Sequence, residues 1–183
     1  MAKVILITGG TRSGKSAYAQ ALAESVSGIR TYIATCPVID EEMEKRIRKH
    51  REARRVSAWR TIEETKDLTG ALKKARESQV ILVDCLTLWI NNLMYEAESQ
   101  GRDITEEDIA LLCREVIEVC DDLPGIIIFV TNEVGMGIVP ENPASRLFRD
   151  LTGRCNQIIA DRADAVTFMI SGLPMNIKGD KII

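Results

Sequence analysis

The segment VILITGGTRSGKS, at residues 4–16, decides the fold class of this chain. It opens with an apolar run at residues 4–8 that is typical of a buried strand, and a helical pattern follows at residues 15–25. Between them the sequence fits G-x-x-x-x-G-K-[ST] without a mismatch, in the strand–loop–helix context in which this pattern binds phosphate. We therefore predict a phosphate-binding loop that consists of Gly9, Gly10, Thr11, Arg12, Ser13, Gly14, Lys15 and Ser16.

Apolar, β-branched runs recur along the chain and alternate with helical patterns. Further strands are predicted at residues 31–34, 80–84, 126–131 and 165–170. Further helices are predicted at residues 41–55, 63–76, 88–98, 106–120 and 145–162. Apolar strands that alternate with helices form a mainly parallel sheet with helices on both faces. We therefore predict one α/β domain over residues 1–183, with the three-layer P-loop NTPase (RecA-like) fold.

The composition is that of an ordinary soluble domain. Hydrophobic residues make up 45% and charged residues 28% of the chain, and the net charge of −3 attracts neither nucleic acid nor membrane. No apolar run approaches the roughly 20 residues that a membrane span requires. Five scattered cysteines and one histidine offer no zinc-site spacing, and the first residues lack a signal-peptide layout. We expect a cytoplasmic protein with no nucleic-acid partner and no membrane span.

Three polar residues give the predicted nucleotide site its chemistry. Two of them lie in the phosphate loop and the third ends a later strand. Lys15 supplies positive charge to the outer phosphates of a nucleotide, and the Ser16 hydroxyl is suited to ligate Mg²⁺. Asp84 ends the apolar run at residues 80–84, the usual place for a carboxylate that holds a metal-bound water. Asp84 is also a common strand-end residue, which is the alternative interpretation. Together these residues predict a site for a nucleotide with Mg²⁺.

His50, the single histidine, lies in a strongly charged segment at residues 41–55. Met43, Ile47, His50 and Arg54 have helical spacing and share one face. His50 is either an ordinary residue where this helix meets the rest of the molecule, or a nucleophile or acid–base group beside bound phosphates. A nucleic-acid surface is a weaker alternative, because no aromatic residues interleave with the charges. The pattern alone leaves these alternatives open.

Short motifs are spread over nearly the whole chain. They are GGTRSGKS (9–16), YIAT (32–35), RI (46–47), HR (50–51), WRTIE (59–63), VDCLT (83–87), VTNEVGMGIVPE (130–141), FRD (148–150), Gly153, NQ (156–157) and SGL (171–173). In this order they resemble the bifunctional adenosylcobinamide kinase/adenosylcobinamide-phosphate guanylyltransferase family. The run VTNEVGMGIVPE is far more specific than the phosphate loop.

The resemblance implies two reactions in one protein. A nucleoside triphosphate, ATP or GTP, would phosphorylate the hydroxyl at the end of the aminopropanol arm of adenosylcobinamide. GTP would then transfer GMP to that phosphate through a covalent GMP–histidine intermediate carried by His50. The resemblance also implies a homotrimer. The alternatives are a P-loop small-molecule kinase without nucleotidyl transfer, and a regulatory or nucleic-acid-binding module that uses residues 45–55.

The resemblance also assigns nucleotide contacts. Beyond the phosphate loop, it implies contacts from Ile33, Ala34, Thr35, Arg51, Glu52, Ala53, Arg54, Glu63 and Asp84, with Mg²⁺ held by Ser16 and Asp84. Some family members have Glu at position 84, which preserves a carboxylate. The Glu63 carboxylate is suited to accept hydrogen bonds from guanine. Residues 132–140 follow a strand end, where α/β proteins bind ligands, and are either a seat for the acceptor or a flexible connector.

Overall fold

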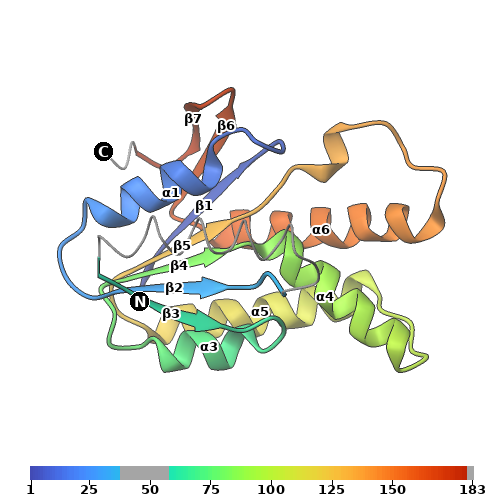
Figure 1. Cartoon of the computed structure of the whole chain (residues 1–183), viewed down its shortest axis with the longest axis horizontal. Helices are drawn as coiled ribbons and strands as arrows, with labels where there is room; N and C mark the ends of the chain where they lie inside the picture. Colours follow the sequence, from blue (N-terminus) through green and yellow to red (C-terminus); the bar gives the residue numbers. More distant parts are fainter. Residues whose placement is uncertain (38–57, 181–183) are drawn as a thin grey trace.

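The structure is a computed structural model that describes residues 1–37 and 58–180 (Figure 1). Its strands are β1 (Lys3–Gly9), β2 (Arg30–Ala34), β3 (Trp59–Glu63), β4 (Val80–Asp84), β5 (Ile126–Val130), β6 (Ala165–Ile170) and β7 (Leu173–Lys178). Its helices are α1 (Lys15–Glu24), α3 (Leu68–Lys74), α4 (Leu86–Ser99), α5 (Glu106–Asp122) and α6 (Pro143–Arg162), with the 3₁₀ turn η1 (Val134–Met136).

The described strands form one seven-stranded sheet in the order β3-β2-β4-β5-β1-β6-β7. Every neighbouring pair is parallel except β6 and β7, which are antiparallel. The predicted mainly parallel sheet is therefore confirmed. Because the strands are parallel, β1, β2, β4 and β5 all end at one edge of the sheet, where parallel sheets bind ligands (Figure 1).

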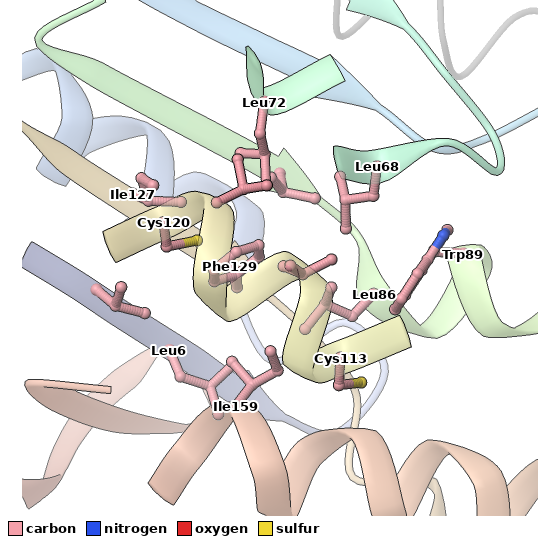
Figure 2. Packing of buried hydrophobic residues seen from close by; sticks show 14 of the residues in the cluster. Leu6, Leu68, Leu72, Leu86, Trp89, Cys113, Cys120, Ile127, Phe129 and Ile159 are labelled. Carbon is pink, nitrogen blue, oxygen red and sulfur yellow. The ribbon is translucent and has the colours of Figure 1, made fainter. Parts of the chain in front are cut away.

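Helices cover both faces of the sheet, as predicted. Ile5 and Ile7 of β1 pack with residues of α1, whereas Val4 and Leu6 pack on the opposite face with α3, α5 and α6. This division follows from the strand period, because successive side chains point to opposite faces. Figure 2 shows the larger core, to which Leu6 and Phe129 of the sheet, Cys113 and Cys120 of α5 and Ile159 of α6 all contribute. The three-layer α/β architecture is confirmed.

The helix predicted at residues 63–76 is wrong at its start. Residues Trp59–Glu63 form strand β3, and the helix begins only at Leu68. The Asp67 side chain caps this helix, because its Oδ1 accepts a hydrogen bond of 2.8 Å from the N–H of Gly70. Glu63, a predicted nucleotide contact, therefore ends a strand and lies five residues before the helix.

Other boundaries shift by small amounts. Helix α4 begins at Leu86 rather than residue 88, and α6 begins at Pro143 after an Asn142 cap rather than at residue 145. The predicted start of α5 is confirmed, since Thr105 and Asp108 form a capping box. Strand β7 was not predicted. The helix predicted at residues 41–55 lies outside the described residues. Within residues 1–37 and 58–180, no helix has the length and apolar character needed to cross a membrane.

Candidate active site at the phosphate loop

The predicted phosphate loop connects the end of β1 to the start of α1. Gly14 precedes the helix with φ of 93°, and Arg12 also has a positive φ, of 58°. Gly14 adopts this left-handed conformation without strain because it has no Cβ. The loop thus turns sharply enough to direct the first N–H groups of α1, at the positive end of the helix, toward a bound anion.

Lys15 is folded back over the loop. Its side chain is buried, and Nζ donates a hydrogen bond of 2.6 Å to the carbonyl oxygen of Gly10. Burial lowers the pKa of Lys15, while the nearby Cys85 and Asp84 side chains act in the opposite direction. The ammonium group is therefore held beside the loop, where it can move to a phosphate oxygen with little reorganisation.

Asp84 reaches this site through the register of the sheet. Strand β5 lies between β1 and β4, and Val130 pairs with both Ile7 of β1 and Asp84 of β4. Two strand spacings, about 10 Å, therefore separate Asp84 from β1. The phenol of Tyr32 donates a hydrogen bond of 3.0 Å to Oδ2 of Asp84. One carboxylate oxygen thus has a fixed partner at the edge where the phosphate loop lies.

The loop and Asp84 border one pocket of about 520 Å³, a volume in the usual range for small-molecule sites. Its lining includes eight predicted site residues: Thr11, Arg12, Ser13, Gly14, Lys15, Ser16, Ala34 and Asp84. The lining also includes Asn132, from the segment 132–140 that the sequence analysis gave as a possible seat for the acceptor, and seven residues that were not predicted as site residues: Ala17, Tyr32, Cys36, Cys85, Thr87, Leu88 and Val130. The described part of the molecule thus brings the predicted loop and the predicted carboxylate into one cavity.

A family model described as cobinamide kinase / cobinamide phosphate guanyltransferase matches residues 5–177. The chain belongs to this family. It is 43% identical to the bifunctional adenosylcobalamin biosynthesis protein CobP of Pseudomonas aeruginosa over 178 residues, 97% of this chain and 98% of the relative. It is 38% identical to the bifunctional adenosylcobalamin biosynthesis protein CobU of Escherichia coli over 182 residues, 96% of this chain and 99% of the relative.

A solved structure supports the fold assignment for this cobinamide kinase / cobinamide phosphate guanyltransferase family member. It is an ATPase from the type III secretion system of pathogenic bacteria, with a TM-score of 0.58 and 11% identity. The match covers 95% of this chain and 56% of the ATPase chain, so this chain spans just over half of that protein. The likeness concerns the fold and agrees with the predicted RecA-like α/β architecture.

Five predicted contacts of this family member that lie within the described residues are not part of the pocket lining, and two of them, Gly9 and Gly10, belong to the phosphate loop itself. The side chain of Ile33 is fully buried in the core. Thr35 is also buried, and its Oγ1 accepts a hydrogen bond from the Cys85 N–H and donates one to the Cys85 carbonyl, both of 2.7 Å. Glu63 ends β3, separated from β4 by β2. Of the segment at 33–35, only Ala34 borders the pocket.

Five predicted site residues lie outside the described residues: His50, Arg51, Glu52, Ala53 and Arg54. The residues that sequence reasoning missed carry two kinds of signal. Thr87 follows the end of β4, so the rule that parallel sheets bind ligands at this edge identifies it. Tyr32 lies within β2, and only its alignment beside Leu82 of β4 explains its contact with Asp84.

A polar network fixes the start of the segment after β5. The N–H and Nδ2 of Asn132 donate to Oγ1 of Thr87 at 2.8 and 3.2 Å. Glu133 accepts hydrogen bonds through Oε1 from Thr8, at 2.5 Å, and from Asn156, at 3.3 Å. The β1, β5 and α6 elements are therefore joined next to the phosphate loop.

Proposed function

We propose that this protein phosphorylates cobinamide with a nucleoside triphosphate and then transfers GMP from GTP to the resulting cobinamide phosphate. The observation that carries this proposal is the pocket in which the phosphate loop meets Asp84, in a chain that belongs to the cobinamide kinase / cobinamide phosphate guanyltransferase family. The bifunctional names of relatives that match nearly the full chain support assigning both reactions to it.

In the kinase step, the cobinamide hydroxyl attacks the γ-phosphorus of ATP or GTP. A P–O bond to the acceptor forms, the bond between the γ-phosphorus and the bridging oxygen breaks, the nucleoside diphosphate leaves and the hydroxyl proton passes to solvent. The backbone N–H groups of the loop and the Lys15 ammonium stabilise the charge that develops on the phosphoryl oxygens and the leaving group.

The pocket also fits a magnesium ion carried by the nucleotide. Ser16 and Asp84 both border it and offer the oxygen donors that Mg²⁺ prefers. Among the described residues, no group of three or more His, Cys, Asp or Glu side chains is arranged to hold a metal. Phosphate oxygens would therefore complete the coordination, and the ion would neutralise phosphate charge. Ser16 would bind it directly and Asp84 would orient its water.

In the guanylyl step, we assign the nucleophile to His50, the only histidine of the chain. An imidazole nitrogen attacks the α-phosphorus of GTP, a P–N bond forms, the bond to the pyrophosphate oxygen breaks and the ring loses a proton. A phosphate oxygen of cobinamide phosphate then displaces His50 and takes over the GMP. Lys15 and Arg12, which border the pocket, would stabilise the departing pyrophosphate. Glu63 is assigned to the guanine base.

Labelled GTP tests this assignment. Incubation with α-labelled GTP is expected to leave acid-labile label on the protein, and cobinamide phosphate is expected to remove it. The variant His50→Ala should lose the label and the pyrophosphate release but keep γ-phosphoryl transfer to cobinamide. Label retained by His50→Ala would exclude His50 as the nucleophile. Kinase activity without any protein label would indicate a plain small-molecule kinase.

The family resemblance further leads us to propose a homotrimer. Sedimentation equilibrium on the purified protein measures the mass directly. A mass about three times that of the chain, whose mass is 20.4 kDa, would support the proposal, and a monomer at micromolar concentration would contradict it.

A further inference from the structure

The segment between β5 and α6 presents three exposed apolar side chains. Met136 is 74% exposed, Ile138 95% and Val139 65%. In Figure 1 this segment arcs out from the end of β5, past η1, to the start of α6. We call these three side chains the acceptor platform. Their exposure is unusual for large apolar residues that lie so close to one another in sequence, and it indicates a binding surface.

One face of α6 holds the backbone of this segment. Arg146 donates through Nη1 to the carbonyl oxygens of Pro140 and Glu141, at 3.0 and 2.6 Å. Arg149 donates to the carbonyl oxygens of Gly135 and Ile138, at 3.0 and 3.2 Å. Arg146 and Arg149 are three residues apart and therefore share a face of the helix. The segment is thus held by its carbonyl groups while the apolar side chains stay exposed.

The near end of the segment is attached to the phosphate loop. The N–H of Glu133 donates to the carbonyl oxygen of Gly9 at 3.2 Å, and the Glu133 carboxylate accepts from Thr8. Asn156, on the same face of α6 as Arg149 seven residues earlier, donates to the carbonyl oxygen of Asn132 at 3.1 Å. Asn132 itself borders the pocket. The platform is therefore fixed in position relative to the phosphate loop.

The length of α6 between these contacts sets the reach of the platform. Asn156 binds the segment at the rim of the pocket and Arg146 binds it ten residues earlier on the helix, which corresponds to about 15 Å along the axis. A ligand that rests on this surface thus extends well beyond the pocket. Cobinamide has a fitting shape, because it is a wide macrocycle that carries methyl groups between its amide side chains and has the reacting hydroxyl at the end of one side arm.

We propose that Met136, Ile138 and Val139 bind the corrin ring of cobinamide while its arm enters the pocket past Asn132. This inference rests on the proposed function and adds the acceptor site to it. A segment that is already ordered by hydrogen bonds loses little conformational freedom when it binds a ligand, so the contact area contributes to affinity. The three platform side chains would not contact the nucleotide, because the phosphate loop lies at the other end of the segment.

The test compares two matched double variants of the full chain in the kinase reaction. Met136→Gln/Ile138→Thr removes apolar surface from the platform. Met175→Gln/Ile177→Thr makes the same changes on β7, where Met175 is 50% and Ile177 59% exposed. The platform variant is expected to raise the KM for cobinamide about tenfold, with the KM for the nucleotide unchanged. The β7 variant should match the wild type in both.

Three results would overturn the inference. An unchanged KM for cobinamide in the platform variant would show that the ring binds elsewhere. An equal rise in the KM for the nucleotide would indicate a general defect of the site. A change of sedimentation coefficient in the platform variant alone would show that this surface joins copies of the chain. A wild-type protein that leaves cobinamide unphosphorylated would instead overturn the proposed function itself.

Discussion

The hydroxyl of Tyr32 donates a hydrogen bond of 3.0 Å to Oδ2 of Asp84 across the β2–β4 pair, at the edge of the nucleotide pocket. A hydrogen bond to one oxygen of a carboxylate fixes the orientation of the group. The orientation of Asp84, and with it the proposed magnesium site, thus depends on a residue from the neighbouring strand.

Replacing this donor tests the dependence. Tyr32→Phe keeps the ring but removes the hydroxyl, so we expect kcat of the kinase reaction to fall about tenfold and the Mg²⁺ concentration for half-maximal rate to rise, given the usual strength of hydrogen bonds to charged groups. A Mg²⁺ titration of initial rates measures both effects. Tyr95→Phe is the matched control, since Tyr95 is 63% exposed on α4. Identical magnesium curves for wild type and Tyr32→Phe would contradict the prediction.

The first two glycines of the phosphate loop should differ in their contribution to stability. A Cβ on Gly9 would lie 2.4 Å from the carbonyl oxygen of Met169, whereas a Cβ on Gly10 would meet no atom within 4 Å. Gly9→Ala is therefore expected to lower the free energy of unfolding by about 3 kcal/mol through overpacking, and Gly10→Ala to leave it nearly unchanged. Urea denaturation of the two variants measures this. Equal free energies of unfolding for Gly9→Ala and Gly10→Ala would contradict the prediction, because they would show that β1 and β6 can move apart without loss of stability.

The cap of α3 predicts a pH dependence. Hydrogen bonds from Gly70 and Thr69 lower the pKa of Asp67, so its contribution to stability is present above the ordinary pKa of about 4 and is lost as pH falls through the lower folded value. At pH 7, Asp67→Ala should cost about 1 kcal/mol of unfolding free energy. The difference from the wild type should shrink below pH 4. Asp67→Asn keeps a capping oxygen without a titrating group, so it should remain close to the wild type at neutral pH.

Cysteine labelling reports on occupancy of the pocket. Cys36 is half-buried and borders the pocket, whereas the other four cysteines are buried. Burial and the Asp84 carboxylate raise the pKa of the Cys85 thiol to about 12, which removes the reactive thiolate at pH 8. A maleimide should therefore label Cys36 first, and GTP should slow that labelling. Mass spectrometry identifies the site. Labelling of Cys36→Ser at the wild-type rate would contradict this prediction.

Much of the fold could be predicted from local sequence. The strands β1, β2, β4, β5 and β6 are apolar runs buried by their neighbours, and their composition alone identifies them. The phosphate loop could also be predicted, because its glycines and Lys15 act through local backbone geometry. These features need no information from distant parts of the chain.

Two strands could not be predicted in this way. The residues of β3, WRTIE, are only partly buried, and we expected the last of them to begin a helix. In β7, Leu173, Met175 and Ile177 alternate with Pro174, Asn176 and Lys178, but all six residues are exposed, so neither face of the strand is buried in a core. Each exists because of hydrogen bonds to a neighbouring strand, β2 for β3 and β6 for β7. Such pairing depends on residues far along the chain or across a turn, which local propensity does not encode.

The sequence by itself determined the phosphate loop, the mainly parallel sheet and the resemblance to a cobinamide-modifying family, because these depend on residue types at short spacings. Only the tertiary structure decided that Asp84 shares a pocket with Lys15, that Tyr32 orients Asp84, and that Arg146 and Arg149 hold an apolar segment beside that pocket. The physical reason is that strand register and helix packing bring together side chains whose separation along the chain carries no signal of their contact.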